Sequence, residues 1–154
     1  RIDGILHNAG ILGERVPLAQ YPEEGWDDVM AVNLRAPFVL TQELLPLLQK
    51  SENASVVFAS SGVGREARAE WGAYSVSKIA IEAVSQIFAK ENTYPNIRYN
   101  CVNPGGTRTA MRAKAYPQED PKVLPTPEAI MPAYLYLMGD DSLHMNGESI
   151  DAQD

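Results

Sequence analysis

The sequence predicts an α/β fold in which a doubly wound parallel sheet carries helices on both faces. Short apolar runs typical of buried strands alternate along the chain with longer stretches whose apolar residues follow a helical period. Strands and helices that alternate in this way are joined by right-handed crossovers, which make the sheet parallel. With 154 residues, 45% of them hydrophobic, the chain has the size of one domain.

The first half of the chain is predicted to contain a strand followed by a long helical stretch. Residues 3–8 form a short apolar run that ends at Ala9-Gly10, as expected for a buried strand that stops in a turn. Residues 23–49 have apolar side chains at helical spacing. Because Pro37 lies inside this pattern, we expect two helices or one kinked helix, with the break beside Asn33.

The second half is predicted to repeat the alternation of strand and helix. Strands are expected at residues 55–60 and 97–102, and the clearest helical periodicity covers residues 73–89. A last helix is expected near residues 127–138, with Thr126 as its N-cap and Pro127 at its first position, before a short strand at 148–151.

Polar or glycine-rich segments follow each of the three main predicted strands. They are Asn8-Ala9-Gly10, Ser60-Ser61-Gly62 and Pro104-Gly105-Gly106. In parallel sheets, ligands bind outside the carboxyl ends of the strands. We therefore expect the binding site to be built from these three segments.

Charge and composition exclude several classes of function. A net charge of -7 disfavours partners such as nucleic acid or an anionic membrane, and no apolar run approaches the roughly 20 residues of a membrane span. The lone cysteine, Cys101, cannot form an internal disulfide, which favours a cytoplasmic location. His7, His144 and Cys101 lack metal-ligand spacing, so we expect no metal site.

Tyr74 and Lys78 are the first candidates for chemistry. They are four residues apart at the start of the clearest helix, so their side chains share one face. Taken alone, the pair could equally be a solvated helix pair. Ser61 precedes Tyr74 by 13 residues at the end of the preceding strand, and Asn33 marks the helix break before that strand.

In this order, Asn33, Ser61, Tyr74 and Lys78 resemble the catalytic tetrad of the classical short-chain dehydrogenase/reductase family. Further segments that match the family are residues 8–10, 73–78 and 103–109. The resemblance implies the C-terminal part of a Rossmann-like fold, NAD or NADP as cofactor, and a small alcohol or carbonyl compound as substrate. Residues 108–112 and 138–141 look like an uncharacterised bacterial oxidoreductase branch of the family.

The chemistry of hydride transfer gives each member of the tetrad a role. Tyr74 would protonate the substrate oxygen, which requires its pKa of about 10 to fall to about 7, or roughly 4 kcal/mol of preferential phenolate stabilisation. The ammonium of Lys78 would supply a large share of that stabilisation. Ser61 would donate to the substrate oxygen, and Asn33, by resemblance, would hold a water that connects Lys78 to solvent.

The resemblance also implies which residues contact the cofactor. Pro104, Gly105, Thr107 and Thr109 would border the nicotinamide, while Asn8, Ala9 and Gly10 would lie along the adenosine side. Tyr74 and Lys78 would contact the cofactor as well, Lys78 through the nicotinamide ribose. His7 stands where the family more commonly has Asn, and we interpret it as structural.

The family opens with a strand and a glycine-rich turn that binds the pyrophosphate, and no such segment precedes Asn8. We therefore expect residues 1–154 to form a single partial Rossmann-like domain that lacks the N-terminal βαβ half. The choice between NAD and NADP would depend on that half. The predicted lid, residues 108–125, has mixed charges that select no obvious substrate.

Two other interpretations remain open. One is an epimerase or dehydratase of the extended relatives, which usually carry a larger C-terminal region; the other is a non-catalytic binding or interaction domain that keeps part of the fold. The family habit of pairing two long helices implies a homo-oligomer. Leu44, Leu48, Ile81 and Phe88 are candidates for that contact, the alternative being burial against the chain's own sheet.

Overall fold

The computed structural model describes residues 1–153 and contains one four-stranded parallel sheet in the order β1-β2-β3-β4. The strands are β1 (Gly4–His7), β2 (Ala54–Ala59), β3 (Ile97–Asn103) and β4 (Ser149–Asp151). The register pairs Ile5 with Val56, Val57 with Asn100 and Val102 with Ile150. The predicted parallel sheet and its four strands are therefore confirmed, with boundaries that differ by at most one residue.

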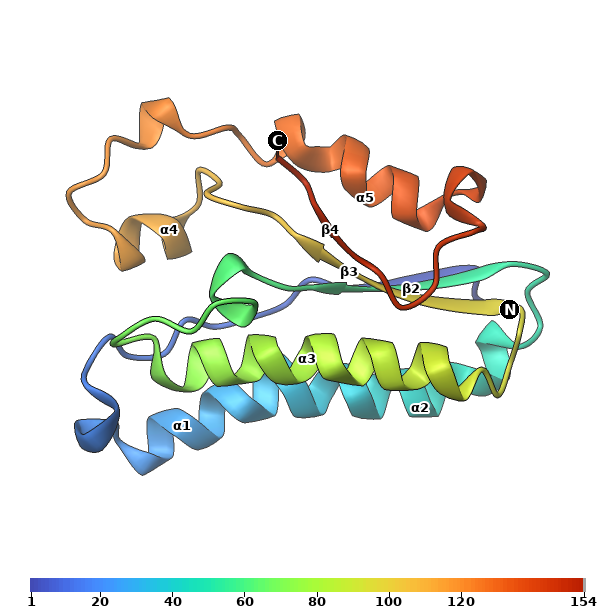
Figure 1. Cartoon of the computed structure of the whole chain (residues 1–154), viewed down its shortest axis with the longest axis horizontal. Helices are drawn as coiled ribbons and strands as arrows, with labels where there is room; N and C mark the ends of the chain where they lie inside the picture. Colours follow the sequence, from blue (N-terminus) through green and yellow to red (C-terminus); the bar gives the residue numbers. More distant parts are fainter. Residues whose placement is uncertain (154) are drawn as a thin grey trace.

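Helices cover both faces of this sheet (Figure 1). On one face lie α1 (Glu23–Met30), α2 (Ala36–Leu48) and α3 (Gly72–Glu91), and on the other lies α5 (Met131–Met138). None of the helices among residues 1–153 has the length and apolar character that crossing a membrane would require. The doubly wound α/β class predicted from the sequence is confirmed.

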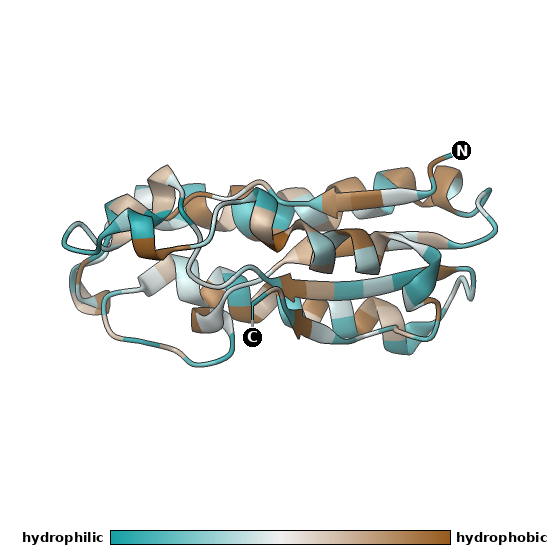
Figure 2. Ribbon diagram, turned by 90° about the horizontal axis from the view of Figure 1, so that it is seen from above, coloured by the Kyte–Doolittle hydropathy of each residue, from teal (hydrophilic) through white to brown (hydrophobic). Residues whose placement is uncertain are grey.

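Strand β2 joins the two halves of the core because every one of its residues is buried. Side chains alternate between the two faces of a strand. Val56 and Phe58 accordingly pack with Leu48 and Ile81 on the α2 and α3 side, whereas Val57 packs with residues of α5. Figure 2 shows apolar segments along the strands and helices, and hydrophilic residues on the connecting loops.

The predicted break beside Asn33 is a five-residue π-helical turn, Ala31–Arg35, which joins α1 to α2 without a separate loop. Pro37 lies in the first turn of α2 and has no backbone N–H. The carbonyl of Asn33, four residues earlier, therefore cannot receive an α-helical hydrogen bond. The helix widens at this point, and Asn33 is the buried residue of the turn.

The last predicted helix begins later than expected. Residues Glu128–Ile130 form a 3-10 turn, and α5 starts only at Met131, so the prediction that Thr126 caps this helix is wrong. Pro132 explains the delay, because it has no N–H to bond to the carbonyl of residue 128. The predicted lid also contains a short helix that the sequence did not indicate, α4 (Ala110–Ala115).

Candidate active site

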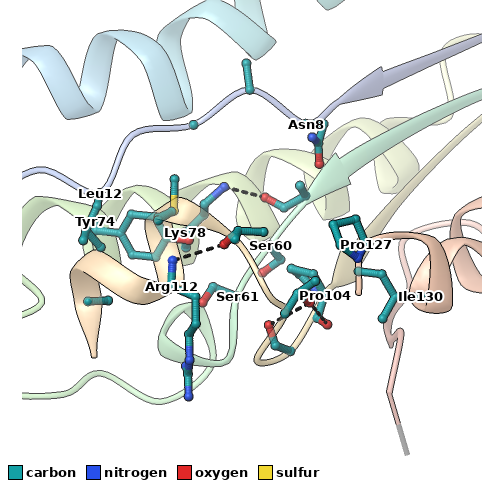
Figure 3. A pocket seen from close by; sticks show the side chains of 18 of the residues that line it. Asn8, Leu12, Ser60, Ser61, Tyr74, Lys78, Pro104, Arg112, Pro127 and Ile130 are labelled. Atoms are coloured by element: carbon teal, nitrogen blue, oxygen red, sulfur yellow. Dashed lines mark hydrogen bonds between the residues drawn. The ribbon is translucent and has the colours of Figure 1, made fainter. Parts of the chain in front are cut away.

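A cavity of about 490 Å³ opens at the carboxyl ends of β1, β2 and β3, where the sequence predicted a binding site. Figure 3 shows side chains from all three strand ends and from α3 gathered around it. Every residue predicted to be catalytic or to contact the cofactor lines this cavity, except Asn33. Those residues are Asn8, Ala9, Gly10, Ser61, Tyr74, Lys78, Pro104, Gly105, Thr107 and Thr109.

Tyr74 and Lys78 occupy the first turns of α3 and are both buried. Lys78 Nζ lies 5.7 Å from the centre of the Tyr74 ring and donates a 2.6 Å hydrogen bond to the carbonyl of Ala59. Burial lowers the pKa of Lys78 to about 8. This lysine therefore titrates close to neutrality.

The pKa of Tyr74 differs from the sequence-based expectation. Burial raises the pKa of this phenol, and the hydrogen bond from the Ser61 side chain lowers it only in part. The Lys78 ammonium donates its hydrogen bond to the Ala59 carbonyl and not to the phenol. Ser61 is thus the polar group that acts on the phenol in this structure.

Asn33 does not line the cavity, but its side chain hydrogen-bonds to elements that do. Its side chain accepts a 2.8 Å hydrogen bond from the backbone N–H of Ile11 and donates a 2.9 Å bond to the Ile11 carbonyl. It also donates to the Ser77 hydroxyl at 3.1 Å. The amide of Asn33 therefore joins the loop after β1 to α3, between Tyr74 and Lys78.

The loop after β3 lines another side of the cavity. Gly105 has a φ of +68°, which glycine adopts without strain. The Gln153 side chain folds onto this loop and donates to the carbonyls of Pro104, at 2.6 Å, and Gly106, at 3.1 Å. Thr109 caps α4, since its hydroxyl accepts the backbone N–H of Arg112 at 3.1 Å, so it serves the lid as well as lining the cavity.

Several residues that line the cavity were missed by the sequence analysis, and most of them are apolar. Trp71 is buried, with its ring centre 5.7 Å from that of Tyr74. Its position three residues before Tyr74 was the available signal. The others come from the loop after β1, the lid, and the segment around α5, which carried no polar motif: Leu12, Met111, Arg112, Ala115, Pro127, Ile130, Met131 and Tyr134.

The contacts of His7 are those of a structural residue. Its ring stacks on Phe58 at 5.0 Å, and its Nε2 lies 2.9 Å from the Thr41 hydroxyl. Burial lowers the pKa of His7 to about 4, so the ring is neutral at physiological pH. Within residues 1–153, no group of His, Cys, Asp and Glu side chains is arranged to hold a metal ion.

Two of the four residues expected at a contact between subunits, Leu48 and Ile81, need correction. Leu48 and Ile81 are buried in the chain's own core, at 0% and 2% exposure, so they cannot form an interface. Phe88 stacks on Tyr99 and packs against the same core. The large exposed apolar side chains of α2 and α3 are instead Phe38, Leu40, Val76, Ile79 and Ile87.

Residues 1–120 match the sequence model of the short chain dehydrogenases, and the chain belongs to this family. It is 57% identical over 153 residues to an uncharacterized oxidoreductase of Escherichia coli K12, YciK. That alignment covers 99% of this chain and 60% of YciK. A 3-oxoacyl-[acyl-carrier-protein] reductase of Thermotoga maritima, FabG, is 34% identical over 158 residues, covering 97% of this chain and 64% of FabG.

The chain also superimposes closely on solved structures of short chain dehydrogenases. A short chain dehydrogenase from Shigella flexneri 2a, complexed with NADP, superimposes with a TM-score of 0.96 at 56% identity. The match covers 100% of this chain and 64% of that chain, and the values are the same for an Escherichia coli CFT073 protein complexed with NADPH. The chain spans about three fifths of the length of the relatives that it matches.

Proposed function

We propose that this chain carries the catalytic centre of an oxidoreductase that uses NADP(H) to interconvert an alcohol and a carbonyl group of a small molecule. The observation that carries the proposal is the meeting of Ser61, Tyr74 and Lys78 in one cavity at the carboxyl edge of a parallel sheet. A proton donor, a hydrogen-bond donor and a buried cation then face the same space. An interaction domain would have no need of a buried ammonium at this place.

The cavity suits the nicotinamide end of the cofactor. Small residues form its walls, Ala9 and Gly10 on one side and Gly105 on the other, so a flat ring and a ribose can approach the backbone closely. The choice of NADP(H) is supported by the two similar structures complexed with NADP and NADPH. When bound, the nicotinamide supplies or accepts the hydride.

The residues of the chain handle the proton and the developing charge. In the direction of carbonyl reduction, Tyr74 donates its phenolic proton to the substrate oxygen, and Ser61 donates a hydrogen bond to the same oxygen. Lys78 stabilises the resulting phenolate by its charge and, through its hydrogen bond to Ala59, stays aligned with the end of β2.

The part of the cavity beyond Tyr74 selects the kind of substrate. Trp71 and Met111 line it, together with Ile130 and Tyr134 from the α5 side, so this part of the cavity is predominantly apolar. A carbonyl compound with an apolar substituent would fit it. We propose this substrate class.

We also propose that the protein is cytoplasmic, since its lone cysteine is a buried free thiol, and that it forms a homo-oligomer through α2 and α3. Leu40 and Ile79 are 50% and 44% exposed on these two helices. Exposed large apolar side chains on neighbouring helices favour a protein contact at this surface.

The central test is a Tyr74→Phe substitution in the full-length protein. NADPH oxidation is measured against a panel of ketones, aldehydes and 3-oxo esters. We expect Tyr74→Phe to lower kcat by about 10²–10⁴-fold, because the proton donor is lost, and to leave the Kd for NADPH within about twofold. Tyr136→Phe, which removes a hydroxyl outside the cavity, is the matched control. A Tyr74→Phe protein with most of its activity would disprove the proposal.

A further inference from the structure

Ser61 lies in a turn whose two ends are bound to the same carboxylate. The hydroxyl of Ser60 donates a 2.5 Å hydrogen bond to Glu82 Oε1, and Arg65 Nε lies 3.4 Å from the same oxygen. Glu82 belongs to α3 and follows Lys78 by one helical turn and Tyr74 by two. The helix that carries the proton donor therefore also holds both flanks of Ser61.

The same turn packs directly against α3. A Cβ at Gly64 would come within 2.8 Å of the Lys78 backbone carbon, so the turn and the helix are in contact there. The Ser75 hydroxyl, next to Tyr74 in the chain, donates a 2.5 Å bond to the carbonyl of Val63. These contacts fix the distance between the turn and α3, and the contacts with Glu82 fix the position of the turn along the helix axis.

Arg65 extends this attachment to the cofactor-facing wall. Its Nη1 bonds both carboxylate oxygens of Asp151, at 2.8 and 2.9 Å, and its Nη2 bonds the Ser149 hydroxyl at 2.8 Å. Asp151 in turn accepts a 2.6 Å bond from the Asn103 side chain, and Asn103 Oδ1 accepts the N–H of Gly105. A continuous chain of hydrogen bonds joins the Ser61 turn to the loop on the opposite wall.

Arg65 is the cation that joins the two acidic members of this chain, and the Ser149 hydroxyl also donates to Glu82 Oε1, at 2.9 Å. The Arg65 side chain is 31% exposed and separates two carboxylates, those of Glu82 and Asp151, whose exposed fractions are 13% and 52%. Burial works against the charge of Arg65, but its contacts with Asp151 and Glu82 raise its pKa overall. Without the guanidinium, the Glu82 carboxylate would lose its cation and the two acidic groups would repel each other.

We propose that Arg65, acting through Glu82 and Asp151, is a positioning residue that holds the turn carrying Ser61 in place against α3, the helix that carries Tyr74. The proposal rests on the proposed function, in which Ser61 and Tyr74 act on one substrate oxygen. It adds a residue whose role follows from the contacts of this chain rather than from the tetrad.

The test is a double-mutant cycle in the full-length protein, with Arg65→Met, Ser61→Ala and the combination of the two. If Arg65 acts through Ser61, Arg65→Met lowers kcat by roughly tenfold, less than the 10²–10³-fold of losing a donor outright. In the Ser61→Ala background, Arg65→Met then has little further effect. Arg35→Met is the matched control, since Arg35 is exposed and makes no side-chain hydrogen bond within residues 1–153.

The second readout is the titration of Tyr74, which a purely structural role would not move. The Ser61 hydrogen bond lowers the pKa of Tyr74, so its loss raises that pKa. The alkaline limb of the pH profile for carbonyl reduction should therefore move to higher pH in Arg65→Met, as in Ser61→Ala. The Cζ resonance of ¹³C-labelled Tyr74, followed by NMR in the complex with NADP⁺, gives the same titration without a substrate.

The outcomes separate the two proposals. Arg65→Met that matches wild type in kcat and in Tyr74 titration, while Ser61→Ala changes both, would overturn the role of Arg65 and leave the proposed function intact. Additive losses in the double variant would also overturn it, because Arg65 would then stabilise the fold independently of Ser61. If Ser61→Ala itself changes neither quantity, the proposed function fails at Ser61.

Discussion

The buried ammonium of Lys78 should make the stability of the protein depend on pH in a defined way. Lys78 is 5% exposed, and burial lowers its pKa from 10.5 to about 8. At 1.36 kcal/mol per pH unit, this difference corresponds to about 3 kcal/mol of destabilisation when the lysine is charged. The hydrogen bond to Ala59, whose loss costs about 1–2 kcal/mol, offsets part of it.

The sign follows from proton binding. Between pH 8 and 10.5, Lys78 is mostly neutral in the folded protein and mostly protonated in the unfolded chain. The unfolded state therefore binds more protons in this window, and the contribution of Lys78 to stability rises with pH across it. Below pH 8 both states are protonated, and the folded protein bears the full cost of the buried charge.

Lys78→Met in the full-length protein removes this dependence. We expect the variant to be about 1–2 kcal/mol more stable than wild type near neutral pH, and to lose this advantage as the pH rises through the window. Urea unfolding of both proteins at several pH values measures the difference, in which other titrating groups cancel. Lys50→Met, at an exposed lysine, is the control. A difference that stays constant with pH would refute the reasoning.

Two further predictions concern the substrate and the assembly. Trp71 lines both the main cavity and a neighbouring one of about 190 Å³, so Trp71→Leu should join them and raise kcat/KM for bulky ketones relative to small ones. An unchanged preference along a homologous ketone series would contradict this. Ile79→Glu places a charge on the exposed face of α3 and should reduce the oligomer to monomers in sedimentation measurements. A wild-type protein that is already monomeric would refute the proposed assembly.

The fold could be predicted from the sequence because each of its main strands has an unambiguous local pattern. Residues of β2 are buried on both faces, which produces the continuous apolar run seen in the sequence. The start of α5 was predicted wrongly because Pro127 and Pro132 both suit a first turn, and only the structure shows that the α-helix begins at Met131, with Pro132 rather than Pro127 in its first turn.

The polar part of the candidate site was predictable and the apolar part was not. Tyr74 and Lys78 have a fixed spacing on one helix, and their neighbours follow strand ends, so chain order alone places them together. Trp71 and Met111 carry no such pattern, because an apolar residue at a cavity resembles one in a core. Leu48 and Ile81 failed as interface candidates for the same reason, since helical periodicity gives the apolar positions of α2 and α3 without saying which face meets the sheet.

Asn33 shows how a local defect in a helix can serve the site. The π-helical turn disrupts the regular hydrogen bonding between α1 and α2, a cost that an isolated helix would not bear. The turn places the Asn33 side chain inside the protein, where three hydrogen bonds, two with Ile11 and one with Ser77, satisfy its amide. These bonds fix the loop after β1 against the helix that carries Tyr74 and Lys78. The loop contributes Asn8, Ala9 and Gly10 to the cavity, so the defect determines the distance between the expected cofactor wall and the proton donor.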